Sequence, residues 1–265
     1  MSLNERARNH LGGIVVLALA LAFHLTWLAR VPPGLDRDAA ANGWLALKWL
    51  RDGVVPFWIP HASAPEPLIV WLQTAITGWL GPSVAAWRAA SALFLALAAV
   101  ATYALTLVVA RPLPAAQRWW AALLAGVIFA CNPVITQLAR TGLRATTLPL
   151  LSALFFLALQ RAWRTNARRD YVVSGMVLGM AAYTYLAARF LPLVVLIFVA
   201  VAWWGEWRAR RAVTPPAAWS RLVGLLLMGL AALVVVLPQL VFFTIYPTAF
   251  WERAQSVSLL ANPEY

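Results

Sequence analysis

Long apolar runs separated by short loops make up most of this 265-residue chain. A helix needs roughly 20 predominantly apolar residues to cross the hydrocarbon core of a bilayer. The pattern predicts seven such helices: Gly12–Leu28, Trp87–Ala110, Trp119–Ile135, Ala145–Leu159, Tyr171–Leu186, Phe190–Trp204 and Leu222–Ile245. The first run is long for the apolar part of a signal peptide and lacks a clear small-residue cleavage site, so we expect a retained span.

Residues 31–86, between the first two predicted spans, differ from the rest of the chain. Ala39–Asp52 has an apolar side and a polar side at helical spacing, which is typical of a helix lying in the membrane interface. Gly53 is expected to end this helix. Pro67–Leu80 is apolar but short for a span, so a second interfacial or re-entrant helix is predicted there. We therefore interpret 31–86 as a loop that carries two juxtamembrane helices.

The composition indicates a membrane protein. Hydrophobic residues make up 63% of the chain and charged residues 11%, whereas soluble domains carry about 25% charged residues. The fifteen Trp residues fit a belt of rings at the headgroup level. A formal net charge of +12 could point to nucleic acid, but the basic residues fall in short loops between apolar runs. We therefore expect an all-α, polytopic transmembrane helical bundle whose partners are membrane lipids and not nucleic acid.

Basic residues are distributed unequally between the two predicted sides of the membrane. One set of loops holds twelve of the 21 Lys and Arg residues: Arg6, Arg8, Arg111, Arg118, Arg161, Arg164, Arg168, Arg169, Arg208, Arg210, Arg211 and Arg221. Because cytoplasmic loops are enriched in Lys and Arg, we predict that the N-terminus is cytoplasmic. The loop at 31–86 would then face outward from the plasma membrane.

Two acids at the end of the first apolar run are the main candidates for chemistry. The sequence has no glycine-rich phosphate loop, zinc motif or nucleophile elbow, so an activated substrate would come from elsewhere, most naturally from the bilayer. The carboxylates of Asp36 and Asp38 could accept a proton from an attacking hydroxyl or bind a divalent cation. Alternatively, Asp38 is the N-cap of the helix that follows and accepts a backbone N–H.

Four further charged residues are predicted on the same outer side. Glu66 lies between two prolines that restrict its backbone, and it could also be a structural cap or a partner for a loop arginine. Arg140 and Arg144 are four residues apart and would share a face if the segment were helical. Together with Arg189 they could bind a phosphate or an anionic headgroup. The alternative is that these arginines are anchors whose stems run through apolar surroundings.

Several stretches resemble one family of membrane enzymes. The run Pro32-Pro33-Gly34-Leu35-Asp36-Arg37-Asp38-Ala39-Ala40-Ala41-Asn42-Gly43 resembles the first outer loop of bacterial C-type (GT-C fold) glycosyltransferases, more narrowly of family-39 and mannosyltransferase-like members. Further similar stretches follow in the same order: Pro65–Leu72, Gly81–Ser83 with Arg88, Ser91–Leu93, Arg140–Ala145 and Tyr183–Phe190. The resemblance covers nearly the whole chain, which would be the N-terminal half of such an enzyme.

The resemblance implies transfer of a sugar from a polyprenyl-phosphate carrier to an acceptor hydroxyl at the outer membrane face, with inversion at the anomeric carbon. Asp38 would be the general base, and the outer arginines would lie near the lipid phosphate. The implied substrate-binding residues are Asp36, Glu66, Arg140, Arg144 and Arg189. No cofactor follows with certainty, and a divalent cation stays an option.

Two features depart from the family pattern. The usual Asp-Glu pair of the first loop is Asp38-Ala39 here. Members also continue into further spans and often a soluble outer domain, so we interpret 246–265 as the start of a further outer segment of a truncated chain. The alternatives are a non-catalytic relative, or a transporter or flippase of lipid-linked precursors. A transporter should carry ionisable residues within its spans, whereas the acids here lie at span ends or in loops.

Overall fold

The computed structural model describes residues 3–59, 66–208 and 215–251, and the regular structure of these residues is entirely helical. The all-α class predicted from the apolar pattern is confirmed. The chain divides into two compact units. Unit 1 is built from described residues within Met1–Pro56 and Pro67–Leu157, and unit 2 from those within Phe57–Glu66 and Ala158–Tyr265.

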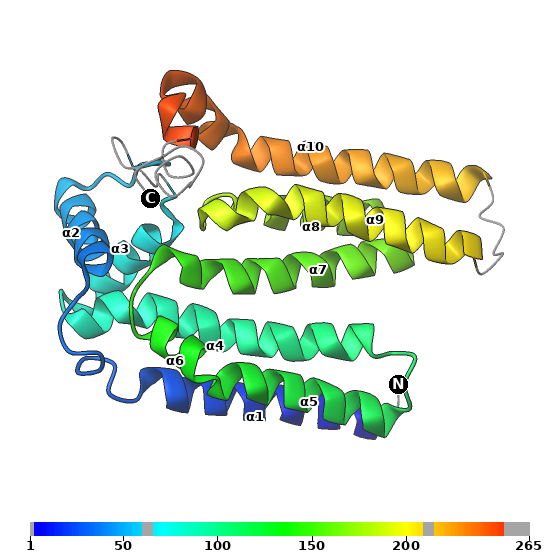
Figure 1. Ribbon diagram of the computed structural model, residues 1–265, viewed down its shortest axis with the longest axis horizontal. Coiled ribbons are helices and arrows are strands. Elements are labelled where there is room, and N and C mark those ends of the chain that lie inside the picture. Colours follow the sequence, from blue (N-terminus) through cyan, green and yellow to red (C-terminus); the bar gives the residue numbers. More distant parts are fainter. Residues whose placement is uncertain (1–2, 60–65, 209–214, 252–265) are drawn as a thin grey trace, which may run out of the picture. The chain divides into compact units, whose positions relative to one another are not determined.

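Three long helices run side by side in unit 1 (Figure 1): α1 (Leu3–Leu25), α4 (Val84–Val109) and α5 (Ala115–Cys131). Most of the residues buried between them are small: Val16, Ala20, Ala96, Ala99, Tyr103, Ala122 and Ala130. A Cβ on Gly126 of α5 would lie 2.8 Å from Val16 Cγ2 of α1. Small side chains matter here because helices in lipid associate through close packing rather than through the hydrophobic effect.

Two shorter helices, α2 (Arg37–Asp52) and α3 (Leu68–Leu80), lie at the end of unit 1 where α4 begins, far from the N-terminus (Figure 1). The two helices predicted within 31–86 are therefore confirmed. Gly53 ends α2 at φ 67°, the left-handed conformation that favours glycine. Trp71 Nε1 donates to Pro56 O at 2.8 Å and ties the start of α3 to the segment that follows α2.

Within the described residues, five helices are long and apolar enough to cross a membrane, which marks the chain as membrane-embedded. They are Asn4–Leu25, Val84–Val109, Arg144–Thr165, Leu186–Gly205 and Trp219–Ile245. A sixth span arises if α5 and α6 (Pro133–Ala139), which meet at a 56° bend, cross together. The Asn132 side chain accepts from two N–H groups at the start of α6. The predicted continuous helix Trp119–Ile135 is therefore broken at this cap.

In unit 2, α8 (Arg168–Ala181) packs along α10 (Pro215–Ile245), while α9 (Leu191–Arg208) follows a short 3-10 helix, η2 (Leu186–Phe190). Gly175 of α8 meets the α10 backbone, since a Cβ on it would lie 2.1 Å from the carbonyl oxygen of Met228. With 14 residues, α8 is shorter than the span predicted in this part of the chain. The number of seven spans and the cytoplasmic N-terminus therefore stay predictions.

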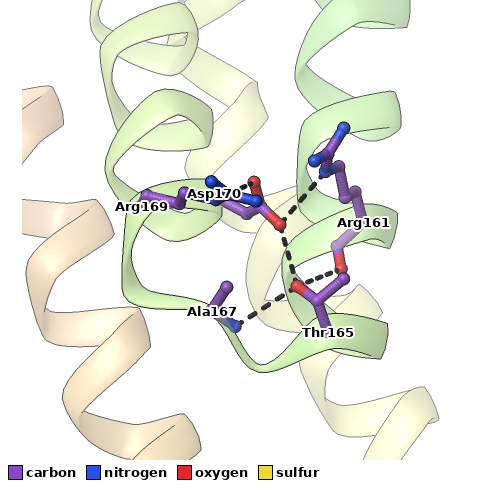
Figure 2. A network of polar contacts seen from close by, with 5 residues as sticks. All are labelled: Arg161, Thr165, Ala167, Arg169 and Asp170. Carbon is purple, nitrogen blue, oxygen red and sulfur yellow. Dashed lines mark hydrogen bonds and ion pairs between the residues drawn. The ribbon is translucent and has the colours of Figure 1, made fainter.

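One carboxylate holds the turn between α7 (Leu148–Thr165) and α8 (Figure 2). Asp170 Oδ2 lies 2.8 Å from the Thr165 hydroxyl and 3.1 Å from Arg161 Nε. The Thr165 hydroxyl is the main cause of a lowered pKa for Asp170, and it outweighs the opposing effect of burial with help from Arg161. Arg161, part of the charge pattern used to predict orientation, lies in the last turns of α7 and therefore also has a structural partner.

Candidate functional site

The start of α2 gives the two candidate acids different roles. Asp36 is the N-cap: its Oδ1 accepts the backbone N–H of Ala39 at 2.8 Å. The alternative that Asp38 caps the helix is wrong, because α2 begins at Arg37 and Asp38 already lies in the first turn. The Asp38 side chain is exposed and makes no hydrogen bond or ion pair with any residue that the structure describes. Its carboxylate is therefore accessible.

A buried arginine shapes the loop that leads into α2. Arg88, near the start of α4, is 1% exposed. Its guanidinium donates to Leu28 O at 2.9 Å, to Pro32 O at 3.0 Å and to Gly34 O. A guanidinium carries five N–H donors in a rigid fork, which suits several carbonyl groups at once. Arg88 thereby fixes the point at which the chain enters α2.

Glycine at position 43 lets α2 come close to the ring of Trp87 in α4. A Cβ on Gly43 would lie 2.6 Å from the ring of Trp87, which is too close for any larger residue without movement of that ring. Ala39, one turn earlier, is buried in the same unit. The buried residues of α2 are Ala39, Asn42, Gly43, Ala46 and Trp49, whereas Asp38 is exposed.

Two buried amide side chains join α2 and α3 to the loop that follows α6. Asn42 Nδ2 of α2 donates to Gly142 O at 3.3 Å, and Gln73 Nε2 of α3 donates to the same oxygen at 3.2 Å. Gly142 has φ 75°, a conformation that residues with a Cβ rarely adopt. The loop is therefore held in position by polar groups that are themselves buried.

Arg144 is part of the same network. Its Nε donates to Asn42 Oδ1 at 3.2 Å. Asn42 follows Asp38 by four residues, or about one helical turn, on α2. Of the residues predicted to form a site, Asp36 and Asp38 thus lie at the start of α2, and Arg144 contacts the same helix through Asn42.

Arg140 lies apart from this group. The condition under which Arg140 and Arg144 would share a helical face is not met, because α6 ends at Ala139 and Gly142 turns the chain between them. Arg140 Nη2 instead donates to Phe23 O at 2.6 Å, in the last turn of α1. A cation bound to a C-terminal carbonyl stabilises a helix end, which is a structural role.

Glu66 and Arg189 pair with each other in unit 2. Glu66 is 2% exposed, and its Oε1 lies 3.5 Å from Arg189 Nη2. The Arg189 guanidinium also stacks over the ring of Phe250 at 4.3 Å and donates to the Phe250 carbonyl. The alternative that Glu66 is a partner for an arginine is therefore confirmed, and Arg189 is not an isolated positive charge.

Three polar residues of this region received no role from the sequence: Arg88, Asn42 and Gln73. One signal was present, since Arg88 is a charged residue inside an apolar run, and such residues have a specific partner or function.

As to the divalent cation, no group of three or more His, Cys, Asp and Glu residues lies together within the described ranges.

The chain was compared with protein-family models, curated proteins and solved structures. No family model matches it, and neither does any curated protein or solved structure. Function must therefore be inferred from the residues and contacts described above.

Proposed function

We propose that the chain is a membrane-embedded glycosyltransferase that transfers a sugar from a polyprenyl-phosphate donor to an acceptor hydroxyl at the extracytoplasmic face. The observation that carries the proposal is that Asp36 caps α2 while Asp38 presents an accessible carboxylate in the first turn. The long apolar helices support a membrane setting. The likeness of residues 32–43 to the first outer loop of GT-C glycosyltransferases supports the reaction class.

Asp38 is the general base in this proposal. The oxygen of the acceptor hydroxyl attacks the anomeric carbon while the carboxylate takes the hydroxyl proton. The bond from the anomeric carbon to the donor phosphate oxygen breaks, and its electron pair leaves with the polyprenyl phosphate. Attack opposite the leaving group inverts the anomeric configuration.

Arg144 is the phosphate-binding residue in this proposal. A guanidinium can donate two parallel hydrogen bonds to phosphate oxygens, and Arg144 donates to Asn42, the residue one helical turn after Asp38 on α2. Arg88 and Asn42 act as positioning residues. We assign Glu66 and Arg189 to the stability of unit 2, because each is bound to the other.

The proposal is tested with the purified chain in proteoliposomes. Radiolabelled polyprenyl-phosphate mannose, glucose and arabinose are supplied in turn, and release of polyprenyl phosphate is measured together with labelled products. Asp38→Asn should lower the initial rate by about 100-fold or more, the usual effect of losing a general base. Asp52→Asn is the matched control, because Asp52 is an exposed acid at the other end of α2 that pairs with Arg51, and its rate should stay near that of the wild type.

Three results would contradict the proposal in different ways. A wild-type rate for Asp38→Asn would remove Asp38 from the chemistry. Movement of intact donor between leaflets without release of polyprenyl phosphate would indicate a transporter or flippase. Binding of donor without turnover or movement would indicate a non-catalytic relative.

A further inference from the structure

A cavity lies at the end of unit 1 that holds the N-terminus, away from α2 and α3. It has a volume of about 470 Å³, and its lining includes the charged residues Glu5, Arg111 and Arg118. The apolar residues Leu107, Val108 and Leu157 also line it and are called its apolar wall below. A second cavity of about 280 Å³ shares Glu5 and is also lined by Arg8. Neither contains any residue of the proposed glycosyl-transfer site.

The charges around Glu5 do not balance. Glu5 forms an ion pair with Arg118, and both side chains are about one-fifth exposed. Arg8 donates to Ala115 O at 3.2 Å. Arg111 is exposed and has no hydrogen bond or ion pair with any residue in the described ranges. One acid therefore faces three arginines, and the positive charge of Arg111 is available to a bound anion.

The cavity lies at the depth where the span helices end. Leu107 and Val108 belong to the last turn of α4, whose candidate span ends at Val109, and Arg111 follows directly in the α4–α5 loop. At this level a bilayer passes from hydrocarbon to headgroups. Basic pockets between transmembrane helices at this depth suit the phosphate of an anionic lipid. A site for a free phosphate ion would not need the apolar wall.

We propose that this cavity binds an anionic phospholipid, with Arg111 and Arg118 on the headgroup phosphate and Leu107, Val108 and Leu157 against the upper part of the acyl chains. The site is on the side predicted to be cytoplasmic. It is independent of the proposed glycosyl transfer, which would take place at the other end of unit 1.

The test titrates the detergent-solubilised full chain with dioctanoyl-phosphatidylglycerol, with dioctanoyl-phosphatidylcholine and with glycerol phosphate, and follows binding by thermal shift and native mass spectrometry. Phosphatidylglycerol should raise the unfolding temperature and appear as a bound adduct. Arg111→Gln should weaken its apparent affinity about tenfold, the loss expected for one charge-assisted contact. Ala104→Phe, which places a ring into the cavity without changing any charge, should also weaken binding.

Arg6→Gln is the matched control, because Arg6 is an exposed arginine of α1 at the same end that does not line either cavity. Its affinity should stay within about twofold of the wild type, as expected for a screened surface charge. Equal losses for Arg6→Gln and Arg111→Gln, with Ala104→Phe unaffected, would show nonspecific surface attraction and overturn the site. Saturation by glycerol phosphate at the same concentrations would show that the ligand is a free phosphate ester, and equal binding of phosphatidylcholine would show that charge is not recognised.

Discussion

Replacing Arg88 with methionine should release the loop that leads into α2. Methionine keeps an unbranched apolar stem but is shorter than arginine and provides no hydrogen-bond donors. The carbonyl groups of Leu28, Pro32 and Gly34 would then lose the guanidinium that now binds all three. Because this loop leads directly to the N-cap Asp36, its loosening should disturb the start of α2.

The three carbonyl groups differ in their access to water. Leu28 is buried, Pro32 is half-buried and Gly34 is exposed, so the Gly34 carbonyl can regain a water partner. A buried acceptor left without a donor costs about 1–3 kcal/mol, which applies fully to Leu28 and partly to Pro32. Removing a buried charge also removes its desolvation cost, which offsets part of this loss. We therefore expect a net loss of about 2–3 kcal/mol in the free energy of unfolding.

Hydrogen exchange of residues 28–38 and thermal unfolding in the same detergent measure these effects. Arg88→Met should lose amide protection in this loop. Arg88→Lys, whose ammonium group has three donors on a compact head, should show protection between that of Arg88→Met and that of the wild type. Arg37→Gln is the control, because Arg37 is exposed at the start of α2 and its loss should leave protection unchanged. Wild-type protection in Arg88→Met would show that the guanidinium does not hold the loop.

Two further predictions concern unit 2. Gly175→Ala should destabilise the chain by about 1–3 kcal/mol through overpacking against Met228 O, whereas Gly229→Ala, where an added Cβ meets nothing within 4 Å, should be neutral or stabilising by up to about 1 kcal/mol. Equal changes in unfolding temperature for the two variants would contradict the α8–α10 packing. For Asp170 the pKa is lowered in the folded state, so its carboxylate stabilises the fold above the ordinary pKa of about 4, and this contribution is lost as the pH falls further. Asp170→Asn should therefore unfold at a lower temperature than the wild type at pH 7, with a difference that shrinks below about pH 4, and a constant difference down to pH 3 would count against this ion network.

The helices followed from the apolar pattern because a chain in lipid must satisfy its backbone groups internally. The break at Asn132 could not be predicted from the apolar pattern, although the sequence contains the signal for a helix start there. Asn132 followed by Pro133 is a cap with proline in the first turn. It lies within a continuous apolar run, and hydropathy alone does not register the interruption.

The candidate site was predictable only in part, for two physical reasons. Whether Asp36 or Asp38 caps α2 depends on a shift of two residues in the helix start, which is within the usual uncertainty of helix boundaries. The bonds of Asn42 and Gln73 to Gly142 join residues 100 and 69 positions apart. Such contacts depend on how the helices and loops meet in space, and no local pattern encodes them.

Ala39 bears on how many acids this site can use. In the GT-C loop pattern that residues 32–43 resemble, a second acid stands at this position, yet here Ala39 is 3% exposed. A glutamate there would place a charge in the interior, which costs several kcal/mol unless it is paired. Asp36 does not replace it, because its carboxylate accepts the Ala39 N–H and a cap of this kind contributes about 1 kcal/mol to the helix. Under the proposed function, no neighbouring carboxylate can replace Asp38 as the base. Asp38→Asn should therefore be nearly inactive and not only slower than the wild type.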